Sequence, residues 1–383
     1  MRLNTDYSDI KRQIEELAIS LRNCTDKYEF HERYMTFCAL KYIYSLKKRC
    51  RVELSQELDD FGIKSDEEFS NMAKQSFLDN RNYHTEVLVN SFDKPSELLI
   101  SFIEKNYKRY DRRGRTFRFR NGEVDELLRT FFRENLPVGN DILKDIYESG
   151  HLYRFNAPTM MGTEAFVTFN SFDNTSNIFL YRKPNTVSTV AALVHEIGHA
   201  YDYFEGSSSL STAERTKYST NSIFVEVLSC YCNQLFLEYL LKNGIREEET
   251  TFCLVDYFTS IFASLESALL LTQLSDKEYK AVFDGSISKR DVVGYLKNKG
   301  LIEEGIFFFG KDSIMLSGID ENRYSYGGII SNMILDGKIK LEDFMSIRGK
   351  DFSGEELESI GFSPLEARKS LVKRMRETLT KKF

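Results

Sequence analysis

Apolar residues recur every three or four positions along much of the chain, the spacing that puts them on one face of an α-helix. The first run consists of Ile10, Ile14, Leu17 and Leu21. A second run lies between Tyr34 and Leu46, after a polar break, so the two runs predict a helical hairpin. The same spacing predicts further helices over 66–80, 84–107, 123–135 and 140–149.

After residue 150 the pattern changes to short segments rich in β-branched and aromatic residues. They are separated by turn-forming residues, which predicts three strands over 151–156, 164–170 and 177–183. Helical spacing then returns over 188–205, 219–243, 247–273, 289–299, 324–336, 340–347 and 364–380. The sequence therefore predicts a mainly α fold with a small β-sheet. We expect a helical N-terminal region, 1–150, and a second region, 151–383.

The stretch RTFRFRNGE, 115–123, alternates basic and apolar residues and carries an Asn121-Gly122 turn signal. This pattern predicts a β-hairpin with one apolar face. Residues 105–120 are strongly basic, with aromatic residues between the charges. One interpretation is a solvated hairpin, and the other is an arm that attracts an acidic substrate or stacks on nucleic acid.

The net charge and the amino-acid composition argue against some classes of function. Over 383 residues, 52 basic and 58 acidic side chains give a net charge of −6, which supplies no general attraction to nucleic acid or to an anionic membrane. No apolar run reaches the length of a membrane span and no signal peptide is evident, so we expect a cytoplasmic protein. The six cysteines contain no CxxC pair, and we expect reduced structural thiols.

Two histidines and a glutamate stand in an otherwise nearly uncharged stretch, TVAALVHEIGHAYDYF, 189–204. His195 and His199 are four residues apart, so on a helix both imidazoles lie on one face and can converge on one metal ion. Glu196 follows the first histidine and can take a proton from a water molecule at the metal's open position. This is the HExxH arrangement.

The apolar neighbours of this motif predict an interior helix, where unpaired ionisable groups are costly. A divalent cation would supply the missing partner. The alternative interpretation is structural, with two neutral histidines bonded to backbone carbonyls and Glu196 in a salt bridge.

A catalytic zinc usually has three protein ligands. Glu226 is the single charged residue of the apolar segment SIFVEVLSCYCNQLF, 222–236, and we expect it to be the third ligand, from the middle of a helix. The alternative is a buried carboxylate paired with a lysine or arginine. Glu205 and Glu214 lie nearer in sequence but in polar or loop settings, and Asp202 could orient a ligating histidine.

The segment IFLYRKPNTVSTVAALVHEIGHA, followed by FVEVLS, resembles the M3 family of zinc metallopeptidases, and within it the oligoendopeptidase F branch. The resemblance implies a zincin-like (gluzincin) fold with a small β-sheet beside the active-site helix. It also implies one Zn²⁺ per chain, with His195, His199 and Glu226 as ligands and Glu196 as the catalytic base.

The C-terminal segment RYSYGGIISNMI, 323–334, is similar to the tyrosine-rich helix of that branch. The resemblance implies that a tyrosine hydroxyl there stabilises the oxyanion, with Tyr326 as first choice and Tyr324 as second. The alternative is that both tyrosines only pack. This chain departs from the family in having no histidine beyond His199 and in being short, so the N-terminal region should enclose the cleft less completely.

The expected function is a zinc-dependent, oligoendopeptidase-like hydrolysis of short unfolded peptides. EAFVTFN, 164–170, could be an edge strand that aligns an extended peptide, and GSSSLST, 206–212, could flex between the ligand helices. The expected partner is a peptide substrate, and we expect no nucleic acid and no membrane. The alternatives are an M32-like carboxypeptidase and a catalytically weak, metal-containing peptide-binding protein.

Overall fold

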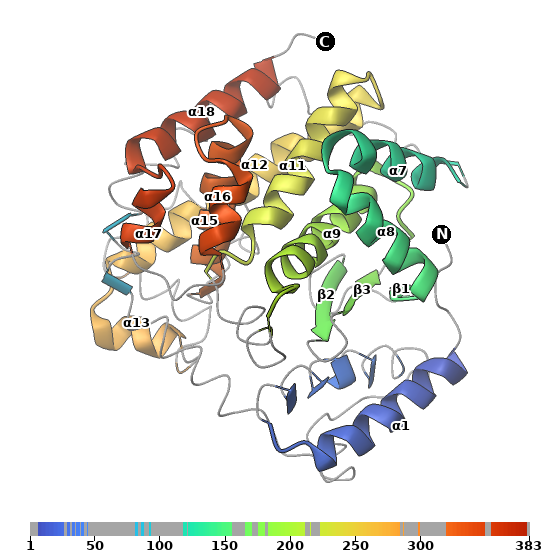
Figure 1. The fold of residues 1–383 in the computed structure, drawn as a ribbon. Coiled ribbons are helices and arrows are strands. Elements are labelled where there is room, and N and C mark those ends of the chain that lie inside the picture. Colours follow the sequence, from blue (N-terminus) through green and yellow to red (C-terminus); the bar gives the residue numbers. More distant parts are fainter. Residues whose placement is uncertain are drawn as a thin grey trace. The chain divides into compact units, whose positions relative to one another are not determined.

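The computed structural model describes most of the helices and strands of the chain (Figure 1). The described residues are 7–26, 118–120, 122–154, 165–170, 175–180, 183–210, 223–283, 319–348 and 354–380, with isolated positions between 29 and 44 and between 81 and 92, and at 215, 286 and 298. The chain divides into two compact units, 1–73 with 117–221 and 74–116 with 222–383. These boundaries differ from the division expected at residue 150. The expected role of 1–150 as a cover over a cleft stays a prediction.

The first unit combines helices with the sheet. Its elements are α1 (Tyr7–Asn23), α7 (Glu123–Asn135), α8 (Pro137–Ser149), β1 (Leu152–Arg154), β2 (Ala165–Asn170), β3 (Thr175–Leu180) and α9 (Val187–Ser207). α7 has the predicted bounds. α8 begins three residues before the predicted start because Pro137 lies in its first turn, where the fixed φ of proline suits a helix and its missing N–H costs nothing.

Within the described residues, the sheet has three strands in the order β1-β3-β2. β1 runs parallel to β3, and β2 runs antiparallel to it. A strand lies in each of the three predicted segments, and β3 begins two residues before its predicted start, at Thr175. β2 lies at an edge of this sheet, as the sequence suggested for EAFVTFN.

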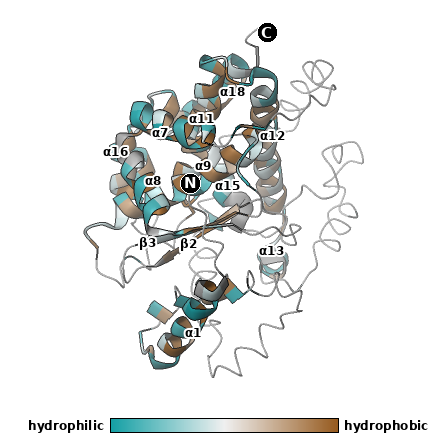
Figure 2. Cartoon of the chain, turned by 90° about the vertical axis from the view of Figure 1, so that its right-hand side faces the viewer, coloured by the Kyte–Doolittle hydropathy of each residue, from teal (hydrophilic) through white to brown (hydrophobic). Residues whose placement is uncertain are grey.

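An aromatic row crosses one face of the sheet. Phe179 of β3 stacks on Tyr153 of β1 at 4.9 Å and on Phe166 of β2 at 4.7 Å, between ring centroids. Tyr153 and Phe179 share a core with the apolar side of α1, which includes Ile10 and Ile14. Figure 2 shows both hydrophobic and hydrophilic residues on α1, as expected for an amphipathic helix. The first helix of the predicted hairpin is confirmed, and helical positions between 29 and 44 fit the second.

The hairpin predicted for 115–123 is wrong in its second half. Gly122 has a φ of +87° and precedes α7 directly, so the Asn-Gly signal marks a helix start. A left-handed φ is accessible to glycine at little cost, in a helix entry as in a hairpin turn. Residues 118–120 form no strand, and the basic stretch from 105 to 117 lies outside the described residues.

The second unit is helical throughout its described part. Its elements are α11 (Val227–Lys242), α12 (Glu247–Thr272), α13 (Asp276–Phe283), α15 (Ile319–Leu335), α16 (Leu341–Ile347), α17 (Gly354–Ser359) and α18 (Pro364–Thr380). α16 and α18 match their predicted ranges closely, and α13 and α17 were not predicted. The helix predicted over 66–80, and most of those predicted over 84–107 and 289–299, lie outside the described residues.

α12 is long and apolar enough to cross a membrane, by length and composition alone. Half of the apolar window is buried inside the protein, and the helix packs against α11, α15 and α18. Two acidic residues, Asp256 and Glu266, interrupt it. Asp256 lies on the exposed side of the helix, whereas Leu254, Phe258, Ile261 and Leu265 are buried. α12 is therefore a core helix of the second unit.

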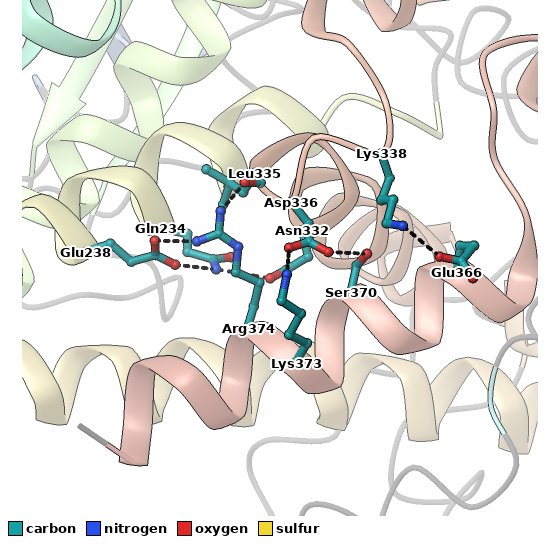
Figure 3. A network of polar contacts seen from close by, with 10 residues as sticks. All are labelled: Gln234, Glu238, Asn332, Leu335, Asp336, Lys338, Glu366, Ser370, Lys373 and Arg374. Atoms are coloured by element: carbon teal, nitrogen blue, oxygen red, sulfur yellow. Dashed lines mark hydrogen bonds and ion pairs between the residues drawn. The ribbon is translucent and has the colours of Figure 1, made fainter. Parts of the chain in front are cut away.

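A polar network ties α11, α15 and α18 together (Figure 3). Arg374 of α18 donates to the Glu238 carboxylate of α11 at 2.8 Å and also to the Leu335 carbonyl at the end of α15. Gln234 of α11 donates at 3.0 Å to the Asn332 side chain of α15. Charge-assisted bonds of this kind are stronger than neutral ones, so the network fixes the three helices relative to one another.

Candidate metal centre

α9 carries the HExxH motif, and its start is well defined. Thr186 and Thr189 form a reciprocal cap, in which each side chain accepts a hydrogen bond from the backbone N–H of the other, at 3.2 and 3.0 Å. Such a box satisfies two of the N–H groups that a helix start leaves without intrahelical partners. The helix spans Val187–Ser207, which confirms the prediction for 188–205 with short extensions at both ends.

α9 is an interior helix, as the apolar sequence around the motif predicts. It packs on β2, β3 and α8, and Tyr203 stacks on Phe169 of β2 at 4.5 Å. Residues on all sides of the helix are buried, including Val190, Leu193, Val194 and Ile197. A helix that is apolar all round is typical of a core position, so the motif stands on a rigid support.

The two histidines lie side by side on this helix. Their ring centroids are 4.9 Å apart and the rings stand nearly perpendicular, at 87°. His199 is 7% exposed and His195 is half-buried, so the pair remains reachable from one side. Glu196, also 7% exposed, follows the first histidine, where the helix turns its side chain away from the line that joins the two imidazoles.

Glu226 does not lie in the middle of a helix, which corrects the sequence prediction. It is the last residue of the turn 223–226 and stands directly before α11. Glu226 therefore stands at the N-terminal end of α11. Ser229, one turn on, donates to Glu226 Oε2 with an Oγ to Oε2 distance of 3.0 Å. A charged carboxylate is the form that binds a divalent cation.

α15 packs closely against the residue that carries this carboxylate. A Cβ on Gly327 would lie 2.8 Å from Glu226 Cβ, 2.9 Å from Glu226 O and 3.0 Å from Cys230 Sγ. Only glycine permits so close an approach. On the other side, Tyr257 of α12 donates to the Cys230 carbonyl at 3.2 Å. Burial, and then the charge of Glu226, raise the pKa of the Cys230 thiol well above its ordinary value.

His195, His199 and Glu226 form a group that could bind a metal ion. One ligand atom of each residue lies within 4.8 Å of those of the other two. Atoms that bind one zinc ion at about 2.0–2.2 Å are at most about twice that far apart, so the group fits an ion after small side-chain adjustments. Two imidazoles and one carboxylate are also a ligand set known from catalytic zinc. The sequence predicted the same three residues.

The two candidate tyrosines have different environments on α15. Tyr326 is 0% exposed, and its ring packs edge to face on Phe224 at 5.7 Å. Tyr324 is half-buried. Both lie shortly before Gly327, but Tyr324 is the one whose side chain solvent reaches.

Two residues that contact Glu226 were not predicted from the sequence. They are Ser229 and Gly327. The sequence carried a weak signal for both. Ser229 follows Glu226 by three residues in an apolar helix, and Gly327 is one of two adjacent glycines after the tyrosines of another. Asp202 is 2% exposed on α9, and the proposed role in orienting a histidine stays a prediction. Cys24, Cys38, Cys230, Cys232 and Cys253 form no disulfide among the described residues, and Cys50 lies outside them, so reduced structural thiols stay a prediction.

Comparison with known proteins shows a distant structural likeness. No family model matches the chain, and no curated protein sequence matches it. A crystal structure from Chlamydophila abortus, described as that of a "putative peptidase", is similar to it with a TM-score of 0.45 and 14% identity. The match covers 97% of this chain and 62% of the other, so the chain spans less than two thirds of that protein. A likeness this distant identifies neither a family nor an activity.

Proposed function

We propose that this protein is a zinc-dependent peptidase of the zincin-like (gluzincin) type, similar to the M3 oligoendopeptidase F branch. His195, His199 and Glu226 would hold one Zn²⁺ per chain. The convergence of these three ligand atoms, within 4.8 Å of one another, is the observation that carries the proposal. It is supported by Glu196, a carboxylate beside the first histidine that a purely structural metal site would not require.

Zinc and Glu196 would have different roles in the proposed hydrolysis. Zinc bound here would polarise the peptide carbonyl and lower the pKa of a water molecule. Glu196 would take the proton of the attacking water and pass it to the leaving amine, as a general base and then a general acid.

A tyrosine of α15 would donate its hydroxyl to the oxyanion. Tyr324 is the better candidate, because its side chain is half-buried and can meet a substrate. Tyr326 was the first choice from the sequence, but its complete burial against Phe224 favours a packing role. A tyrosine side chain packed completely inside the core has little freedom to serve a substrate.

β2 would align the substrate. It is an edge strand of the sheet and packs on the motif helix α9. An extended peptide can add to such an edge by main-chain hydrogen bonds. This mode requires an unfolded segment, which favours short unfolded peptides as substrates.

The proposal is tested by the metal content of the purified protein and by the masses of products from a ladder of unstructured peptides. We expect about one zinc per chain and cuts at internal bonds, both lost on treatment with a chelator. Stepwise loss of single C-terminal residues would favour the M32-like carboxypeptidase. Zinc without any cleavage would favour a metal-containing peptide-binding protein, and absence of zinc would refute the metal site.

A further inference from the structure

We infer that Ser229 and Gly327 are positioning residues that orient the Glu226 carboxylate for the metal. The inference rests on the proposed metal site. Neither residue offers a metal ligand itself, since one is an uncharged alcohol and the other has no side chain. Both contact Glu226, from two different helices.

Ser229 holds one oxygen of the carboxylate. Its Oγ lies 3.0 Å from Glu226 Oε2 and 3.0 Å from the Glu226 backbone carbonyl. The backbone bond is the usual one for a serine inside a helix. The carboxylate is charged and therefore the stronger acceptor, so it should take the larger share of the single hydroxyl proton. Ser229 is completely buried, so water does not compete for this bond.

This bond limits the rotation of the carboxylate. A glutamate side chain has three rotatable bonds, and the last is broad and poorly defined by itself. With Oε2 held by Ser229, fewer orientations of the carboxylate, and of Oε1, are accessible. Partners of this kind, which contact a ligand and not the metal, typically contribute 10- to 100-fold to metal affinity.

Gly327 restricts the position of the Glu226 Cβ and backbone. The absence of a Cβ lets α15 approach Glu226 Cβ and the Glu226 carbonyl to within normal packing distance. An added methyl group would meet backbone as well as side-chain atoms, so Glu226 would have to shift. The next residue, Gly328, faces a different helix: its added Cβ would lie 2.4 Å from the Ile261 side chain of α12.

The polar network of Figure 3 also joins α11 and α15, further along both helices from the contact at Gly327. Gln234 joins α11 to α15 through Asn332, and Arg374 of α18 joins both. α11 and α15 are thus joined by the close contact of Gly327 with Glu226 and, further along both helices, by polar bonds. Glu226 therefore stands on a framework that several contacts besides metal ligation hold together.

Ser229→Ala tests the first contact, with Ser331→Ala as matched control. Ser331 is also completely buried and also donates to the carbonyl three residues earlier, at 3.2 Å, but that carbonyl belongs to Gly328. Zinc affinity is measured by competition with a coloured chelator, on protein whose folding is checked by circular dichroism. We expect Ser229→Ala to weaken affinity roughly 10- to 100-fold, and Ser331→Ala to leave it within about twofold of wild type.

Gly327→Ala tests the second contact, with Gly328→Ala as matched control. Both variants add one methyl group to the same helix, and both should lower the unfolding temperature. Only Gly327→Ala should also lower zinc affinity, by roughly tenfold. A wild-type protein that binds no zinc overturns the proposed function and this inference together. Wild-type binding with equal affinity in Ser229→Ala and Gly327→Ala overturns this inference alone.

Discussion

The two parts of the candidate metal centre are built in different ways. The histidine pair comes from one turn of α9, and the distance between its rings follows from the helix itself. Glu226 stands at the start of α11 and is contacted by Ser229 from the same helix and by Gly327 from α15. One part is specified by local spacing, and the other by tertiary packing.

The difference explains why the two parts should respond differently to substitution. A residue near the histidines can change without moving them, provided that α9 stays helical and buried. The orientation of Glu226 depends on the distance between two helices and on one hydrogen bond. We therefore expect the carboxylate to be the more easily disturbed ligand, although the removal of any ligand has the larger effect.

The largest effect is expected from removing a ligand from either part. His199→Ala and Glu226→Ala should each weaken zinc affinity by more than the roughly 100-fold that an outer partner can contribute, and abolish peptide hydrolysis. Zinc content after dialysis against a weak chelator is the measurement. His151→Ala is the control, since His151 lies before β1 and outside the group of three. Full zinc content in either ligand variant would contradict the assignment of that ligand.

Glu196→Gln distinguishes zinc binding by His195 and His199 from the proton transfer that we assign to Glu196. Glutamine has the same shape but cannot accept the proton, so hydrolysis of a quenched fluorescent peptide should fall by about 10²- to 10⁴-fold. Zinc content should stay at the wild-type level, because this residue is not one of the three ligands. Equal rates in wild type and variant would refute Glu196 as the base.

The sequence predicted the locally specified features well. The bounds of α7 and α18 and the His195/His199 pair all follow from spacing within one helix or from a cap. The start of α11 was placed eight residues too early, at 219 in place of 227, because Ile223, Phe224 and Val225 directly before Glu226 are as apolar as the helix that follows. Periodicity does not tell a tight turn from a helix. Asn121-Gly122 failed for a related reason, since a left-handed glycine serves a helix start as well as a hairpin.

The contacts of Glu226 could not be predicted, because they include a residue about 100 positions away. Gly327 is noticeable in the sequence only as one of two adjacent glycines in a helix. Its role depends on which helix packs against it, and the two glycines face different partners, Glu226 and Ile261. Helical spacing predicts which face of α15 is buried, but not its neighbour.

Substituting the two tyrosines of α15 should produce a smaller effect than replacing Glu196. Tyr324→Phe removes the proposed oxyanion donor, and kcat should fall by about 10²- to 10³-fold or less. Tyr326→Phe keeps the ring that packs on Phe224, so kcat should change little. Steady-state rates on one peptide, with zinc content confirmed for both variants, provide the measurement. The reverse order of effects would restore Tyr326 as the donor.

The smallest effect on the site is expected from the polar network at the far end of α11. Arg374→Ala removes the bonds to the Glu238 carboxylate and the Leu335 carbonyl. Loss of a half-buried, charge-assisted bond should lower the free energy of unfolding by about 1–3 kcal/mol, measured by urea denaturation of the zinc-free protein. Zinc affinity should nevertheless stay close to that of wild type, because Ser229 and Gly327 still hold Glu226. A drop in affinity as large as that of Ser229→Ala would mean that the whole helix bundle, and not the local contacts, orients the carboxylate.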